Sequence, residues 1–181
     1  MLEVRRLRLE GLVEVRPKRI GDDRGFFSEV WSRQAMSEAG LHFDFVQDNH
    51  SRSAKGVLRG LHWQAAPAAQ AKLVRVSRGT AFDVAVDMRR SSPTFGQWEG
   101  LLLSAALWNQ FLIPEGFAHG FLALDEETEV QYKVDAPYRP DLERRLRFDD
   151  PQVGIEWPAL DERPSLSSKD AAAPLLAEIT E

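Results

Sequence analysis

The chain has no cysteine among its 181 residues, which excludes disulfides, thiol nucleophiles and thiolate metal sites. It also has no long apolar run, so we expect no transmembrane helix. The opening MLEVRRLRLEG alternates charged with single apolar residues and offers no apolar block of the kind found in signal peptides. These absences predict a cytoplasmic protein with no membrane partner.

An excess of positive charge is lacking as well. The 23 Lys and Arg residues stand against 28 Asp and Glu, for a formal net charge of -5, which gives no support to nucleic-acid binding. Hydrophobic residues make up 43% and charged residues 28%, an ordinary globular balance. The length suffices for one domain with a substantial core, so we expect a single domain over residues 1–181.

Strand-like alternation dominates from about residue 43 to residue 134. In AFDVAVDM every second residue from Phe82 to Met88 is apolar, and Asp83 and Asp87 fall on the opposite face. The preceding LVRVSRGT is predicted to be a second strand, joined to it by a hairpin turn at residues 78–80. A further pair is predicted from GFAHGFLAL and TEVQYKV, joined by the polar turn at residues 125–127, and a turn at residues 21–25 precedes a strand FFSEVW.

Helical signals are few. Ser32 is an N-cap candidate and Gly40 a stop, which predicts one short helix between them. The C-terminal segment 165–181 contains DAAAPLLAEITE and is predicted to be helical, with Pro174 limiting its length. Many short strands and no βαβ rhythm predict an all-β antiparallel barrel or sandwich, with a jelly roll as first choice.

Two of the four histidines lie in suggestive settings. His119 ends a P-x-G-x-x-H spacing in PEGFAH, which resembles the second motif of cupin jelly rolls, where metal-binding members use this histidine as a ligand. The first cupin motif would supply H-x-H and then a glutamate. Here VLRGLHWQ ends in His62-Trp63-Gln64, and residues 65–69 contain no glutamate. A divalent metal needs about three protein ligands, so we predict a barrel without metal.

Strand alternation in VLRGLHWQ places His62 and Gln64 on one face and Arg59 on the other. His62 would then point into the barrel, while Arg59 would reach a ligand from the other side of the strand or from its end. For His119 an alternative is a partly buried histidine that is hydrogen-bonded inside the barrel.

Seven segments in order give the chain a resemblance to a known family. They are DDRGFFSEVW, FVQDNHSRSAKGVLRGLHWQ, QAKLVRVSRGTAFDVAVDMRRSSPTFGQW, FLIPEGFAHGFLAL, VQYKVDAPY, FDDPQVGIEWP and LSSKD. Together they resemble the dTDP-4-dehydrorhamnose 3,5-epimerases, metal-free cupins of deoxysugar nucleotide biosynthesis, over nearly the whole chain. The sequence departs from the family pattern at Trp63, where Tyr or Phe is expected, at Pro137-Tyr138, where Tyr-Tyr is common, and at Glu143-Arg144, where Glu-Arg-Gly usually begins.

The resemblance implies a thymidine-diphosphate 4-keto-6-deoxyhexose as substrate. Carbons 3 and 5 flank the ketone, so epimerisation needs a base, an acid on the opposite side and a group that holds the enolate oxygen. The matching residues are His62 as base, Asp170 as its orienting partner, Tyr132 as acid and Lys72 as the ammonium for the enolate. No cofactor and no metal are implied.

Three of these four residues also have a structural explanation. Asp170 in SSKD resembles a helix-start signal, Tyr132 a core tyrosine, and Lys72 an exposed lysine at a strand end. Asp83 either lies on a solvated strand face or pairs with Lys72 inside the barrel.

The diphosphate needs cations, because the sequence has no P-loop and no G-x-G-x-x-G after a strand. Arginine suits phosphate through its bidentate geometry. The matched substrate-binding positions are Arg24, Glu29, Gln47, Asn49, Arg59, Asp83, His119, Tyr138, Glu143 and Lys169. The family is dimeric, with N-terminal strands that join the partner's sheet. The resemblance therefore implies a homodimer in which Arg24 and Glu29 serve the neighbouring subunit's site.

Three alternatives remain open at the level of sequence. The first is an epimerase of a related deoxysugar nucleotide that acts at a single carbon. The second is a metal-dependent cupin isomerase or dioxygenase with His62, His119 and a carboxylate such as Asp170 as ligands. The third is a cupin that binds a sugar nucleotide without catalysis.

Overall fold

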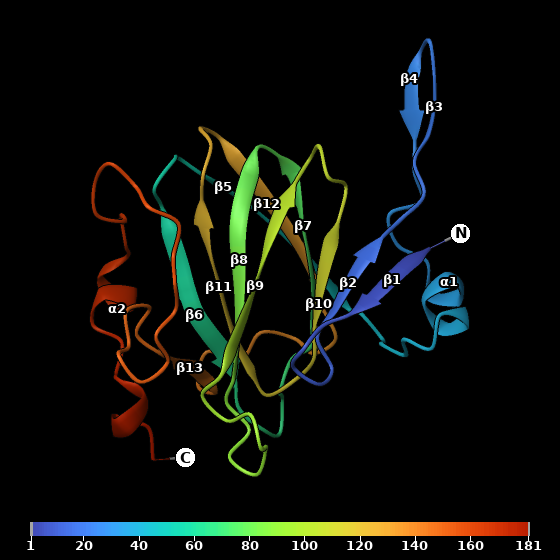
Figure 1. Ribbon diagram of the computed structural model, residues 1–181. Helices are drawn as coiled ribbons and strands as arrows, with labels where there is room; N and C mark the ends of the chain where they lie inside the picture. The colour runs from blue at the N-terminus through green and yellow to red at the C-terminus, as the bar shows by residue number, and fades with distance from the viewer. Residues whose placement is uncertain (1, 181) are drawn as a thin grey trace.

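A computed structural model describes residues 2–180, and it contains two antiparallel sheets that face each other as a flattened barrel (Figure 1). The six-stranded sheet has the order β1 (Glu3–Arg6), β2 (Val13–Arg16), β10 (Gln110–Ile113), β7 (Lys72–Arg78), β12 (Thr128–Val134) and β5 (Gln47–Ser53). The five-stranded sheet has the order β13 (Glu143–Arg145), β6 (Leu58–Gln64), β11 (Phe117–Ala123), β8 (Thr80–Asp87) and β9 (Trp98–Ser104). The predicted all-β jelly roll is confirmed.

The two predicted hairpins are wrong, although their strands are present. β7 and β8 follow each other in the chain but lie in different sheets, and so do β11 and β12. The turn at Gly79, with φ +74°, therefore carries the chain from one sheet to the other. Strand periodicity identifies strands but does not say which strands pair, because both sheets of a jelly roll present the same alternation.

The helices are short, as expected. Helix α1 (Arg33–Glu38) starts at the predicted N-cap, where Ser32 Oγ accepts from the Ala35 amide at 3.4 Å. The C-terminal segment holds only α2 (Ser168–Ala171) and the 3₁₀ turn η1 (Leu176–Glu178), separated by Pro174. No helix in residues 2–180 has the length and apolarity needed to cross a bilayer.

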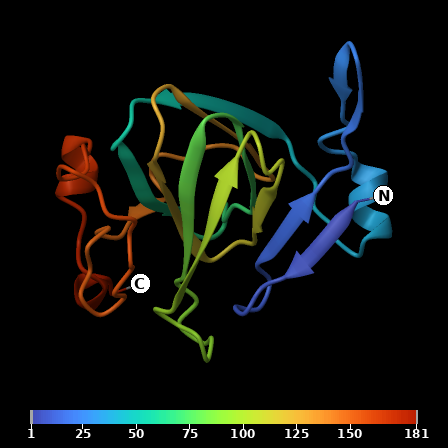
Figure 2. The ribbon, with the colours of Figure 1, turned by 45° about the horizontal axis from the view of Figure 1, so that its top comes forward.

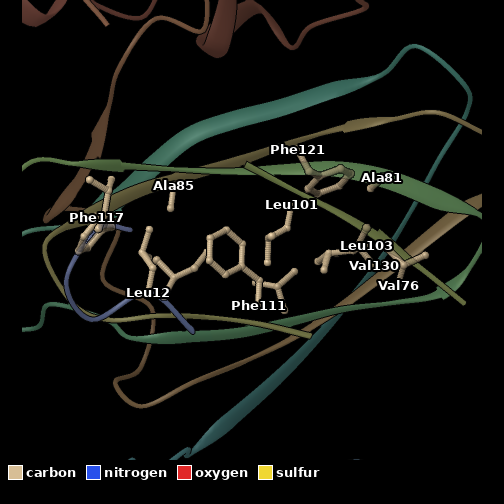
Figure 3. Packing of buried hydrophobic residues seen from close by; sticks show 13 residues of the cluster. Leu12, Val76, Ala81, Ala85, Leu101, Leu103, Phe111, Phe117, Phe121 and Val130 are labelled. Carbon is tan, nitrogen blue, oxygen red and sulfur yellow. The ribbon is translucent and has the colours of Figure 1, made fainter. Parts of the chain in front are cut away.

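The core between the two sheets is apolar and closely packed (Figure 3). Its buried members come from both sheets and from the loop between β1 and β2: Leu9, Leu12, Val74, Val76, Ala81, Ala85, Leu101, Leu103, Phe111, Ile113, Phe117, Phe121 and Val130. This core occupies one part of the barrel interior, which leaves the remaining interior to polar side chains.

Strand β8 turns its apolar face away from that interior. Val84 and Val86 pack instead on the outside of the five-stranded sheet, in a cluster with Trp157 and Leu176 of the C-terminal segment. Asp83, on the opposite face, is fully buried inside the barrel. The C-terminal segment therefore supplies a second hydrophobic layer, and the polar face of β8 is free to serve a site.

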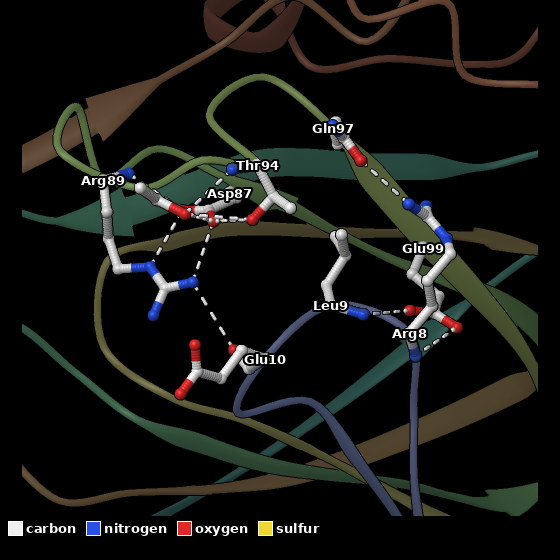
Figure 4. A network of polar contacts seen from close by, with 9 residues as sticks. Arg8, Leu9, Glu10, Asp87, Arg89, Thr94, Gln97 and Glu99 are labelled. Atoms are coloured by element: carbon white, nitrogen blue, oxygen red, sulfur yellow. Dashed lines mark hydrogen bonds and ion pairs between the residues drawn. The ribbon is translucent and has the colours of Figure 1, made fainter.

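A polar network closes one end of the barrel (Figure 4). Asp87 is fully buried and accepts from Arg89 Nε at 2.9 Å and from the Ser92 and Thr94 hydroxyls at 2.6 Å. Burial alone would raise the pKa of Asp87, but these hydrogen bonds outweigh it and lower the pKa to about 2. Arg89 also reaches the Glu10 carbonyl at 3.4 Å, which ties the loop after β8 to the loop after β1.

The N-terminal elements lie on one side of the barrel and the C-terminal segment on the other in both ribbon views (Figures 1 and 2). The hairpin of β3 (Ile20–Asp22) and β4 (Gly25–Phe27) projects away from the barrel (Figure 1). The predicted strand FFSEVW is thus realised only at its beginning. Phe27 is 69% exposed.

Candidate active site

An irregularity in β6 decides which of its side chains face the barrel interior. His62 pairs with His119 of β11 and Arg59 with Phe121, so Gly60 and Leu61 together stand opposite the single residue Gly120. This bulge shifts the alternation by one residue. Arg59 and His62 therefore line the same cavity, and the prediction that Arg59 lies on the other face was wrong.

Gly60 makes this bulge possible. Its φ is +127°, and a Cβ at this position would lie 2.5 Å from the Gly120 Cα and 2.8 Å from the His119 carbonyl oxygen. Both contacts are too close for any side chain, and the positive φ also favours glycine.

Two adjoining cavities of about 320 and 310 Å³ open between the sheets, and both are lined by His62, Lys72 and Tyr132. His62 comes from the five-stranded sheet, whereas Lys72 and Tyr132 come from the opposite one. A larger cavity of about 840 Å³ lies against the C-terminal segment, but none of these three residues lines it. We therefore place the site in the two smaller cavities, where the titratable groups converge.

His62 and Asp170 form a close pair, with Nε2 to Oδ1 at 2.5 Å. A carboxylate can only accept, so Nε2 carries the proton and the lone pair is left on Nδ1. Burial lowers the pKa of His62; the hydrogen bond to Asp170 acts against this, and the Lys72 charge lowers it further. A neutral, oriented imidazole of this kind is suited to act as a base.

Helix α2 positions Asp170. Ser167 caps the helix by accepting from the Asp170 amide at 3.1 Å, and the Asp170 side chain is buried against β6. The helix-start signal and the catalytic role are thus compatible, because the same short helix provides both.

Lys72 is buried at the start of β7, and its Nζ donates to the His62 carbonyl at 3.0 Å across the gap between the sheets. Burial lowers the pKa of Lys72 to about 8, while the charges of Asp83 and Glu143 act in the other direction. The explanation as an exposed strand-end lysine is therefore wrong.

The sequence suggested that Asp83 pairs with Lys72 inside the barrel. Asp83 hydrogen-bonds to His119 instead. Its two carboxylate oxygens lie 2.9 and 3.0 Å from His119 Nε2, and both side chains are buried. The reason is topological, because β8 and β11 are neighbours in one sheet whereas Lys72 lies on the other. The expectation of a hydrogen-bonded histidine inside the barrel is confirmed, and the expectation of a solvated face for Asp83 is wrong.

Tyr132 lines both cavities and is partly buried. Burial raises the pKa of its phenol, although the Arg59 charge acts to lower it. The hydroxyl therefore keeps its proton at neutral pH and is suited to donate one.

Most of the other expected substrate-binding residues also reach these cavities. Gln47 and Asn49 face the first cavity from β5, and their side chains are joined by a hydrogen bond of 2.8 Å. Tyr138 and Glu143 line the same cavity, while Lys169 lines the second. The structure thus brings together residues that are widely separated in the chain.

Arg24 and Glu29 are the exceptions. Arg24 lies in the projecting hairpin, where its guanidinium pairs with Asp22 at 2.6 Å. Glu29 follows the hairpin and is exposed. Neither residue lines either cavity of this chain.

Sequence reasoning missed two roles. Gln64, at the position of the second histidine of the first cupin motif, is buried with all its hydrogen-bonding capacity directed at backbone: Nε2 donates to Ala68 and Pro137 carbonyls, and Oε1 accepts from the Arg139 amide. Arg145 lines the second cavity, and no motif signalled it.

The histidines do not form a metal site with a carboxylate. Among residues 2–180 no group of three or more His, Asp or Glu side chains has an arrangement that would hold a metal ion. His62 and His119 each direct Nε2 at a different aspartate. This geometry does not support the metal-dependent alternative.

Comparison with known proteins identifies the family. The family model described as dTDP-4-dehydrorhamnose 3,5-epimerase matches residues 6–178. The chain belongs to this epimerase family. The Salmonella typhimurium dTDP-4-dehydrorhamnose 3,5-epimerase is 51% identical over 177 residues, covering 97% of this chain and 96% of that protein.

Solved structures of epimerases agree with the fold. The Legionella pneumophila dTDP-6-deoxy-D-glucose-3,5-epimerase, in complex with dTDP-4-keto-L-rhamnose, has a TM-score of 0.95 at 48% identity and covers 99% of this chain and 95% of its own. The Bacillus anthracis dTDP-4-dehydrorhamnose 3,5-epimerase, with TDP and pyrophosphate bound, has a TM-score of 0.93 at 44% identity, with coverages of 97% and 100%. The chain is thus a member of an isomerase family with a cupin-like jelly-roll fold.

Proposed function

We propose that this epimerase converts dTDP-4-dehydro-6-deoxyglucose to dTDP-4-dehydro-L-rhamnose, within dTDP-L-rhamnose biosynthesis in the cytoplasm. One observation carries the proposal. His62 and Tyr132 come from opposite sheets and line the same cavities, so a sugar between the sheets meets a base on one face and a proton donor on the other.

In the proposed reaction His62 removes the proton from a carbon beside the ketone. The electron pair moves onto the C4 oxygen to form an enolate, which the Lys72 ammonium stabilises. Tyr132 then donates its proton to the opposite face of the same carbon and is left as a phenolate. Solvent takes the proton from His62 and returns one to Tyr132, which restores both groups. Repetition at the second flanking carbon gives the doubly epimerised product, and Asp170 holds the His62 imidazole in line throughout.

The remaining cavity residues bind the nucleotide in this proposal. Arg59, Lys169, Gln47 and Asn49 face the cavities with donors for phosphate and sugar oxygens. We further propose a homodimer in which the β3–β4 hairpin brings Arg24 and Glu29 to the partner's site. Phe27 at the end of the hairpin supports this, because 69% of this large apolar residue is exposed on its own chain.

The decisive experiment follows deuterium from D₂O into the 4-keto sugar nucleotide by NMR. We expect incorporation at both C3 and C5. Incorporation at one carbon only would support the single-centre alternative, and incorporation at neither would refute the epimerase assignment. A coupled assay with a ketoreductase that accepts only the epimerised product gives the rate.

A further inference from the structure

A guanidinium lies beside the His62–Asp170 pair and takes no part in the chemistry described above. Arg145 is the last residue of β13, and it stands directly across from His62 in the antiparallel register of β13 and β6. Its side chain is 24% exposed and lines the same cavity as His62 and Asp170.

The contacts of Arg145 connect two residues of the site. Its terminal NH2 group makes an ion pair with Glu143, and its Nε lies 3.7 Å from Asp170 Oδ1. That oxygen is the one that accepts from His62 at 2.5 Å. The Nε group is buried and has no hydrogen-bond partner among residues 2–180, and it makes an ion pair with this shared carboxylate oxygen.

A buried carboxylate needs partners that hold it in place. The Asp170 side chain is 6% exposed, and burying a charged group costs free energy unless it is paired and hydrogen-bonded. The other charged or titratable groups that line the cavities around this pair are Arg59, Lys72, His119 with its partner Asp83, Tyr132, Tyr138, Glu143 and Lys169. Of the cations, Arg145 is the one that forms an ion pair with Asp170.

We infer that Arg145 is a positioning residue of the catalytic pair: its guanidinium keeps the Asp170 carboxylate directed at His62, while Glu143 fixes the guanidinium. This inference deepens the proposed function and rests on it for the catalytic meaning of the pair. The contact is with Asp170 and not with the reacting sugar, so Arg145 acts through its neighbours.

Two consequences separate this role from simple packing. If Arg145 were only a nearby charge, its removal would make His62 easier to protonate, because a cation disfavours the imidazolium. If Arg145 directs Asp170, its removal weakens the contact that raises the pKa of His62, so His62 becomes harder to protonate. The loss of a correctly placed acceptor for His62 Nε2 should also lower the rate of proton abstraction without weakening substrate binding.

The test uses Arg145→Gln, with Arg145→Lys as the conservative variant and Arg144→Gln as the matched control. Arg144 is the neighbouring residue on the other face of β13 and lines neither small cavity. The first measurement is an NMR titration of the His62 ring in the free protein. It needs no turnover, so it tests the inference even if the proposed reaction is wrong. The second is the pH profile of kcat with the sugar nucleotide.

We expect Arg145→Gln to lower the midpoint of the His62 titration by about half a pH unit, with Arg145→Lys returning it toward the parent value. We also expect kcat to fall about ten-fold with KM unchanged, the size of one charge-assisted contact. Arg144→Gln should match the parent in both measurements. An unchanged or raised His62 midpoint in a folded Arg145→Gln variant would overturn the inference, as would a rise in KM with unchanged kcat, which would make Arg145 a substrate ligand.

Discussion

His62 and Asp170 are 108 residues apart in the chain, yet their side chains meet at 2.5 Å. Replacing His62 by Ala removes the proposed base, and we expect kcat to fall by about 10²–10⁴-fold, the usual contribution of a general base. The assay is deuterium incorporation from D₂O. His42→Ala is the matched control, because His42 is exposed and contacts only Ser37 Oγ at 3.1 Å. Full activity of His62→Ala would leave a sugar-nucleotide binder as the better description.

The lowered pKa of Lys72 leads to a second prediction, which concerns the pH dependence of activity. Burial lowers its pKa to about 8, so the ammonium is present below this pH and is lost as the pH rises through it. If the ammonium holds the enolate, kcat/KM should decline on the alkaline side near pH 8. Arginine stays charged at all accessible pH values, so Lys72→Arg should lose this decline even if its rate is lower. If kcat/KM of Lys72→Arg still declined near pH 8, the decline would have to come from a group other than Lys72.

At the scale of elements, the bulge in β6 predicts a loss of stability. In Gly60→Ala the new Cβ would overlap the Gly120 backbone, and φ would remain at +127°. We expect the free energy of unfolding to fall by about 1–3 kcal/mol, as for overpacked sites, together with a loss of activity because Arg59 and His62 move. Thermal unfolding measures the first effect. Gly40→Ala is the control, since its φ is +75° but no heavy atom lies within 4 Å of the added Cβ.

The same bulge shows where sequence reasoning stopped. Alternation correctly predicted β6, β7, β8, β11 and β12 as strands, because period-2 patterning reports exposure directly. It misplaced Arg59, because one extra residue in a strand reverses every side chain beyond it and leaves only a glycine as a signal. It also mispaired consecutive strands, because the crossing between sheets depends on contacts between distant residues.

The site residues were predictable in a different way. His62, Lys72, Tyr132 and Asp170 came from the family resemblance, and the structure brings three of them to both cavities and the fourth to His62. Arg145 had no motif to mark it. Its significance depends on a cross-strand register and on one distance to Asp170, and neither can be read from the order of residues.

At the scale of the whole molecule, the projecting hairpin predicts complementation between subunits. The β3–β4 hairpin, which carries Arg24, projects away from the barrel (Figure 1). Arg24 lines neither cavity of its own chain, so the proposed dimer combines Arg24 of one chain with His62 of the other. Mixing and refolding equal amounts of Arg24→Ala and His62→Ala should restore about a quarter of parent activity. About half of the dimers are then mixed, and each mixed dimer carries one intact site out of two. No recovery, or a monomeric mass in light scattering, would contradict this arrangement.

The C-terminal segment both covers the outside of the five-stranded sheet and delivers Asp170 to His62. Residues 161–163, which precede helix α2, are exposed. An exposed stretch of this kind is a natural place to divide the chain. A protein cut there would consist of a barrel that holds the base and a detachable strip that holds its partner. Proton exchange would then report whether the two pieces have found each other, which makes the fold a starting point for a split-enzyme sensor.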